Sequence, residues 1–168
     1  MSKVLSLRML SDENDSFLRY YRVKDDMTLL DLHACICRDL DYDEANMSSF
    51  FGSDGEWARI GEYTLIDMGV DENSSLQTMD KVEVGRLLQR AGDRLIYQFD
   101  MIGDRCYYLE VAAVGAFDAS EKLPSTVESS GDPVDQFAFD AESNQSIFDQ
   151  MMGDFADFEG DDTYDDPV

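Results

Sequence analysis

The chain has 168 residues, a formal net charge of −24 and 43% hydrophobic residues, which suits one domain or one domain with a tail. Such a negative chain repels nucleic-acid phosphates and anionic lipid headgroups, and it attracts basic surfaces. Its 13 lysines and arginines form no stripe along the sequence, which argues against direct nucleic-acid binding.

Targeting and membrane signals are absent from the sequence. Met1–Leu10 contains no apolar segment of about 7–15 residues followed by a cleavage site, and no apolar run reaches the ~18 residues of a membrane-spanning helix. The three cysteines, Cys35, Cys37 and Cys106, are too few and too scattered for a secreted disulfide scaffold. We therefore expect a cytoplasmic protein with reduced thiols and no membrane partner.

The first part of the chain predicts a hairpin followed by a helix. Lys3–Leu10 and Phe17–Val23 alternate apolar and polar residues with a period of two, which predicts two paired strands. A helix is expected from Thr28 to Leu40, with Thr28 as its N-cap and Asp31 as the acidic partner in a capping box. The apolar stripe of this helix consists of Leu29, Leu32, His33, Ile36 and Leu40.

The middle of the chain predicts short elements. Strands are expected over Met47–Phe51 and Glu62–Met68, with a return strand beginning at Trp57. A short helix is expected over Lys81–Leu88, capped by Asp80.

Arg94–Val114 is the segment on which the fold prediction depends most. Two apolar, aromatic-rich runs flank a turn at Ile102–Asp104, which is typical of a β-hairpin. Two such strands would form the centre of a sheet. The predicted fold class is α+β: a largely antiparallel sheet with one main helix and a short second helix packed on it. The predicted domain covers residues 1–117.

The remaining segment, residues 118–168, is predicted to be an acidic and mostly disordered tail. It carries 15 acidic residues against one basic residue, Lys122, a net charge of −14. High charge without an apolar stripe is typical of disorder, although interspersed aromatic residues are also typical of segments that dock on a partner. A purely solubilising tail is the alternative. The candidate partner-binding residues are Phe137, Phe139, Phe148, Met151, Met152, Phe155 and Phe158.

Few residues suggest chemistry. His33, Cys35 and Cys37 are spaced by two, so on a helix Cys35 points away from the other two, and zinc usually takes four ligands. The sequence therefore predicts no metal and no cofactor, and it contains no nucleotide-binding or nucleophile-elbow signature. A possible body site comprises His33, Asp100, Asp104 and Arg105, of which the two aspartates flank the hairpin turn.

A family resemblance rests on several short stretches. These are Asp26–His33 with Ile36, the pair Phe50 and Phe51, Leu65–Gly69, and Asp93–Asp100 followed by Gly103 and Asp104. In these stretches the chain resembles the plasmid pRiA4b ORF-3-like family, small α+β proteins often encoded on plasmids and beside transposon genes, and it looks like an acid-tailed branch.

The chain departs from the usual family pattern at two places. Cys106 and Tyr108 stand where a Trp and a His follow the hairpin turn, and Asn46–Ser49 replaces histidines that commonly precede Phe50. The resemblance thus implies the fold and supplies no reaction, and the missing histidines weaken an enzymatic interpretation.

Three functional hypotheses follow from the sequence. The first is a non-enzymatic adaptor that docks on a protein with a basic surface, such as a transcription, translation or DNA-transaction machine. The second is a nucleic-acid mimic that occupies a cationic cleft. The third is a small enzyme that uses His33 beside a carboxylate, which requires His33 to be accessible to solvent. An exposed edge at Lys3–Leu10 could also pair two copies in a homo-oligomer.

Overall fold

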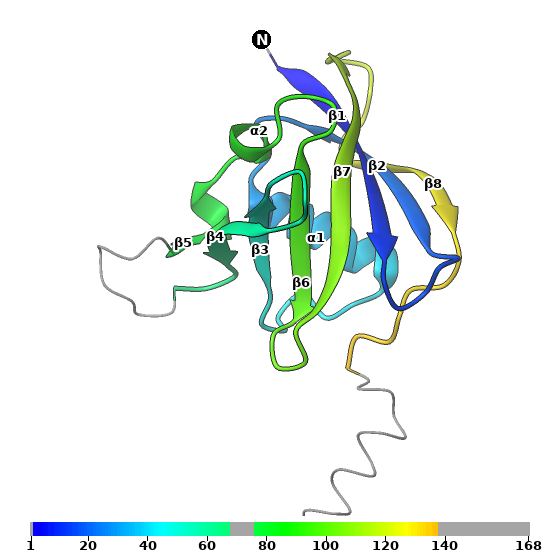
Figure 1. The fold of residues 1–168 in the computed structure, drawn as a ribbon. Helices are drawn as coiled ribbons and strands as arrows, with labels where there is room; N and C mark the ends of the chain where they lie inside the picture. Colours follow the sequence, from blue (N-terminus) through cyan, green and yellow to red (C-terminus); the bar gives the residue numbers. More distant parts are fainter. Residues whose placement is uncertain (1, 68–75, 138–168) are drawn as a thin grey trace, which may run out of the picture. The chain divides into compact units, whose positions relative to one another are not determined.

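An eight-stranded sheet forms the centre of the computed structural model, which describes residues 2–67 and 76–137. The strand order is β5-β4-β3-β6-β7-β1-β2-β8, and every neighbouring pair is antiparallel except β4 and β5. This arrangement confirms the predicted α+β class with a largely antiparallel sheet (Figure 1). The strands are β1 Lys3–Ser11, β2 Leu18–Lys24, β3 Ser49–Ser53, β4 Arg59–Thr64, β5 Leu76–Thr78, β6 Arg94–Asp100, β7 Arg105–Ala116 and β8 Ser125–Ser130.

The main helix, α1 (Leu29–Leu40), crosses one face of the sheet and lies behind β6 and β7 in Figure 1. Its start is the predicted capping box: the Thr28 backbone N–H donates to the Asp31 carboxylate at 3.0 Å, and the Asp31 N–H donates to the Thr28 hydroxyl at 3.1 Å. All five residues of the predicted apolar stripe are buried. The helical spacing of the apolar residues therefore predicted both the helix and the face that it buries.

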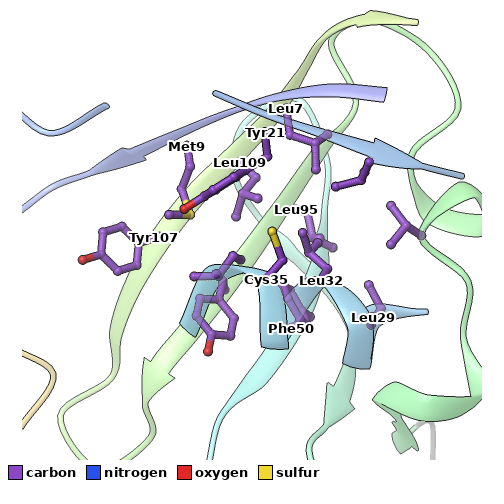
Figure 2. Packing of buried hydrophobic residues seen from close by; sticks show 14 of the residues in the cluster. Leu7, Met9, Tyr21, Leu29, Leu32, Cys35, Phe50, Leu95, Tyr107 and Leu109 are labelled. Carbon is purple, nitrogen blue, oxygen red and sulfur yellow. The ribbon is translucent and has the colours of Figure 1, made fainter. Parts of the chain in front are cut away.

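The core lies between α1 and the face of the sheet that it covers, which we call the inner face. Alternate residues of the central strands point into it, including Leu7, Tyr21, Leu95 and Tyr107 (Figure 2). These side chains are fully buried. Because each strand alternates, the residues between them point to the opposite side, which we call the outer face.

The region around residues 79–88 differs from its prediction. Instead of one helix over Lys81–Leu88 capped by Asp80, a 3₁₀ turn η1 (Met79–Lys81) is followed by the four-residue helix α2 (Val84–Leu87), which has no side-chain cap. The reason is backbone pairing with the start of α1. The Leu29 N–H donates to the Val82 carbonyl at 2.8 Å, which holds Val82 extended and interrupts the helix.

The other expected strands are found with shifted bounds, and the strand expected over Glu62–Met68 overlaps the second half of β4, which ends at Thr64. The edge expected at Lys3–Leu10 is not available, since β1 pairs with β7 on one side and β2 on the other. Strand order depends on contacts between segments far apart in sequence, so alternation alone could not show which strand lies at an edge.

The folded unit extends beyond the predicted boundary. β8 pairs with β2, and the first compact unit is Met1–Val134. Residue 117 therefore lies inside the folded unit, because Ser125–Ser130 completes the sheet. In the second unit, Asp135–Val168, the structure describes residues 135–137, among which Phe137 is 58% exposed. The other candidate partner-binding residues of the tail, from Phe139 to Phe158, lie outside the described residues.

Candidate functional site

The outer face of the sheet carries an apolar row that crosses five strands. Strand register places these side chains beside one another, each opposite the next on the neighbouring strand. The row consists of Phe51 on β3, Ile96 on β6, Tyr108 on β7, Leu10 on β1 and Leu18 on β2. Exposure varies along it, from 2% at Ile96 and 9% at Phe51 to 40% at Leu10. Apolar residues on both faces of a sheet with its helix on one side are typical of a second packing surface.

A charged row runs parallel to the apolar row, two residues away along each strand. Glu110 lies opposite Arg94 on one neighbouring strand and opposite Arg8 on the other. Its carboxylate accepts from Arg8 at 2.6 Å and from Arg94 at 3.1 Å. Cross-strand pairs of opposite charge stabilise a sheet face, so this row borders the apolar row with charges that are already paired.

Trp57 adds a large aromatic side chain to this surface, from the loop between β3 and β4. Its backbone has φ of 66°, a left-handed conformation that is rare for a bulky residue. The Asp54 carboxylate holds the loop by accepting from the N–H groups of Glu56 at 2.8 Å and Ala58 at 2.9 Å. The indole meets the Tyr108 ring edge-to-face at 5.2 Å, so the loop conformation places Trp57 over the apolar row.

Two arginines stack on the aromatic residues of this face. The Arg94 guanidinium lies 4.4 Å from the centre of the Trp57 ring, and that of Arg59 lies 4.5 Å from the centre of the Phe51 ring. We call the set Phe51, Trp57, Ile96, Cys106 and Tyr108 the aromatic cluster. Cation–π contacts fix the orientation of both rings and arginines, so the cluster is a preorganised surface.

Asp104, one of the predicted site residues, lies at the end of the aromatic cluster. Its carboxylate accepts from Arg59 at 2.7 Å and from Gln98 at 2.7 Å. The hydrogen bond from Arg59 lowers the pKa of Asp104, and burial raises the pKa of the neighbouring Cys106 thiol to about 12. The thiol is therefore protonated at neutral pH, which makes it an unreactive packing group.

A groove continues the outer face toward β8. It has a volume of about 480 Å³ and an open mouth. Its lining combines two small residues of β7, Ala112 and Ala113, with the larger side chains of Tyr20 and Val127. The residues that line the groove are Ser6, Leu18, Tyr20, Tyr21, Arg22, Ala112, Ala113, Val127 and Glu128.

His33, another predicted site residue, lies in the core and is 1% exposed. Its Nε2–H donates to the Glu44 carbonyl at 2.8 Å, and Nδ1 therefore accepts a hydrogen bond from the Tyr97 hydroxyl at 2.8 Å. Both ring nitrogens are thus occupied, and the Cys37 sulfur lies 3.7 Å from Nδ1. The accessibility that the His33 enzyme hypothesis requires is not found.

The buried position of His33 predicts a pH-dependent stability. Burial lowers the pKa of His33, and the hydrogen bond to the Glu44 carbonyl opposes this only in part. Below the unfolded pKa of about 6.5, the unfolded chain binds a proton that the folded chain excludes, so stability falls by up to about 1.4 kcal/mol per pH unit. Urea unfolding between pH 7.5 and 5 should show this fall in the natural chain relative to His33→Gln, and parallel pH profiles would contradict it.

The other two predicted site residues form a separate ion-pair cluster. The Arg105 guanidinium lies 2.8 Å from Glu13 and 3.6 Å from Asp100. Asp100 and Asp104 therefore bind different arginines and do not act as a carboxylate pair. His33 has no contact with either of them among the interactions described, so the four predicted residues do not form one site.

Sequence reasoning overlooked the aromatic cluster, although a signal for it was present. In β6, Ile96 lies between the inward-facing residues Leu95 and Tyr97, so both faces of the strand are apolar. A strand with one solvated face would carry a polar residue there. Trp57, the single tryptophan, gave no such signal because its position depends on the loop conformation.

Metal-binding clusters and membrane-spanning helices are both absent from the described residues. Among residues 2–67 and 76–137, no group of three or more His, Cys, Asp or Glu side chains could hold a metal ion. In the same part of the chain, no helix combines the length and apolarity needed to cross a membrane.

Comparison with known proteins gives a family and a fold. The family model described as plasmid pRiA4b ORF-3-like protein matches residues 4–136. None of the curated proteins compared with the chain matches it. The chain is similar to the crystal structure of a protein of unknown function, MM3350, from Methanosarcina mazei Go1, with a TM-score of 0.68 and 15% sequence identity, over 99% of this chain and 97% of that chain. At this identity the likeness concerns the fold alone.

Proposed function

This chain belongs to the plasmid pRiA4b ORF-3-like protein family, and on that premise we propose that it is a non-enzymatic interaction protein that docks on a protein partner with a basic surface. The observation that carries the proposal is the aromatic cluster on the outer face of the sheet, bordered by acidic side chains. The family gives no reaction, so the proposal rests on the surface itself.

The composition of the aromatic cluster supports docking on a protein. Tryptophan, tyrosine and arginine are the residues most enriched at the energetic centres of protein interfaces. Here the Trp57 ring contacts both Tyr108 and Arg94, on a sheet face that no helix covers within the described residues. Their ring and guanidinium contacts hold them in place before binding, which lowers the entropy lost on association.

The distribution of charge supports a basic partner. All 13 cationic side chains lie in the described part of the chain, beside 25 acidic ones. Eight of the 13 already form ion pairs with carboxylates: Arg8, Arg19, Arg22, Lys24, Arg38, Arg59, Arg94 and Arg105. Pairing removes these cations from competition for phosphate, and the excess of carboxylates attracts a cationic surface.

The test compares capture of partners from native cell extract by the natural chain, by Trp57→Ala and by Tyr108→Ala. Each substitution is expected to reduce retention of the same captured protein about tenfold, because loss of a central interface residue costs about 1.4 kcal/mol or more. Ile102→Ala is the matched control, since Ile102 is 89% exposed in the β6–β7 turn. Unchanged capture by both outer-face variants would refute docking through the aromatic cluster.

A chain that ends at residue 137, tested in parallel, separates the contribution of the acidic tail from that of the folded unit. A partner lost only with the tail would place docking there instead. Raising the salt concentration should weaken capture, because exposed charges attract less when screened. Release of the partner by duplex DNA would favour the alternative of a nucleic-acid mimic.

A further inference from the structure

We propose that the groove beside β8 is the peptide-binding part of the docking surface, and that it takes an extended, basic segment of the partner with one apolar side chain. This inference rests on the proposed function and names where and how the partner would be bound. It is carried by three features of the described residues: the free edge of β8, the apolar lining of the groove and the carboxylates at its rim.

β8 offers backbone hydrogen-bonding groups to a partner strand. It pairs with β2 along one side and is the last strand of the sheet on the other. From Thr126 to Ser130 its residues are exposed. An edge strand with unpaired N–H and C=O groups is a template for an added strand, in which the backbone gives affinity and adjacent pockets give side-chain preference.

The groove has the size and chemistry of a pocket for an apolar side chain. Its volume of about 480 Å³ lies within the range of small-ligand sites, which is about 300–1,000 Å³. Leu18, Tyr20 and Val127 provide apolar walls, and Val127 is 59% exposed. A side chain pointing from a strand added beside β8 would replace water on these walls.

Charge at the groove selects a basic segment over an acidic one. Arg22 is the only cation that lines the groove, and Glu121 accepts from it twice, at 2.5 and 3.0 Å. This pairing lowers the pKa of Glu121. Because Nε and Nη2 of Arg22 both donate to Glu121, they are not available for bidentate binding of another carboxylate or a phosphate. Glu128 lines the same groove and has no ion-pair partner among the described residues, so it is available to a lysine or arginine.

A second copy of this chain fits the groove less well than a basic partner does. Each copy carries a net charge of −24, so two copies repel one another before their edges meet. The β8 edge itself contributes Glu128 and no cation. A basic segment is instead attracted both by the net negative charge of the chain and by Glu128 at the edge.

The experiment is a titration of the isotope-labelled full chain with two seven-residue probe peptides, followed by amide chemical shifts. Both peptides alternate arginine and threonine, and the central residue is leucine in one and glycine in the other. The leucine peptide is expected to shift the amides of Thr126–Ser130, Ser6 and Ala113, and to bind at least tenfold more tightly than the glycine peptide. Equal affinities, or shifts spread over carboxylates away from the groove, would overturn the proposal.

Two pairs of matched variants strengthen the test. Val127→Lys should weaken binding of the leucine peptide about tenfold, whereas Ile102→Lys adds the same charge elsewhere and should weaken it less than twofold. Glu128→Gln and Glu56→Gln form a second pair that changes only one exposed carboxylate, so it remains informative if Val127→Lys disturbs folding. Equal effects within each pair would contradict binding in the groove.

The test also separates this inference from the proposed function. If the peptides fail but Trp57→Ala still releases a captured partner, docking stands and the groove is wrong. If capture is insensitive to Trp57→Ala but the leucine peptide maps to the groove, the groove binds without the aromatic cluster. Shifts of the β8 amides with protein concentration alone would indicate that a second copy occupies the edge, and would overturn the assignment to a basic partner.

Discussion

Replacing Arg19 with methionine is expected to lower the free energy of unfolding by about 3–5 kcal/mol, the usual cost of removing one partner of a buried ion pair. Arg19 is 6% exposed, and its Nε donates to the Asp39 carboxylate at 3.1 Å. Its Nη1 donates to the carbonyls of Leu18 at 2.9 Å, and of Ser130 and Gly131 at 3.0 Å each. One guanidinium thus joins β2, α1 and the end of β8. Methionine removes this donor from all four acceptors and, among the described residues, leaves Asp39 with neutral donors alone, the hydroxyls of Tyr21 and Thr126.

Urea unfolding at pH 7 measures this difference, and Arg38→Met is the matched control. The guanidinium of Arg38 lies 3.8 Å from the Glu44 carboxylate, and its side chain is 70% exposed. An exposed pair of this kind contributes about 0–1 kcal/mol. If both substitutions lower the free energy of unfolding by about the same amount, the hydrogen bonds of Arg19 do not stabilise the folded unit.

Alternation and capping predicted most of the local structure. In β1 and β2 buried residues recur with the predicted period of two, and the Thr28–Asp31 capping box marks the start of α1 as expected. These features depend on residues within one or two turns or strands, so the sequence contains their cause. The hairpin formed by β6 and β7 was predictable for the same reason.

The end of the domain was not predictable in this way. Ser125–Ser130 carries a single large apolar residue, Val127, and lies in an acidic, proline-containing stretch. Its composition resembles that of the residues after it, while its place in the sheet is set by β2 and by the buried Arg19. A charged residue in the middle of an apolar strand was the available signal, because a buried arginine requires acceptors from another segment.

In the candidate site, too, features that depend on contacts between distant segments were not predicted. The predicted residues His33, Asp100 and Asp104 were chosen because they are titratable, yet His33 proved to be a hydrogen-bonded core residue. The outer-face row was missed because it exists only once five strands are in register. Surfaces formed across strands depend on pairing, which the local pattern does not specify.

A chain that ends at residue 116 is expected to lose the cooperative fold, whereas a chain that ends at residue 137 is expected to keep it. The shorter chain lacks β8, so β2 keeps β1 but loses its second hydrogen-bonding neighbour, and Arg19 loses the Ser130 and Gly131 carbonyls. It also lacks Val134, whose carbonyl accepts from the Tyr42 hydroxyl. Each buried donor left unpaired costs about 1–3 kcal/mol, and a domain of this size has only about 5–15 kcal/mol of stability.

Thermal unfolding followed by circular dichroism, together with amide spectra of each chain, checks this expectation. The chain ending at residue 137 should melt within a few degrees of the full chain, because every described interaction of the folded unit is kept. The chain ending at residue 116 should show a broad transition or none. If it melts cooperatively near the temperature of the full chain, β8 is an addition to a domain that is complete without it. In that case the strand that contributes Val127 and Glu128 to the groove is not needed for folding. Loss of the fold would instead mean that β8 both completes the domain and is the strand proposed to bind the partner.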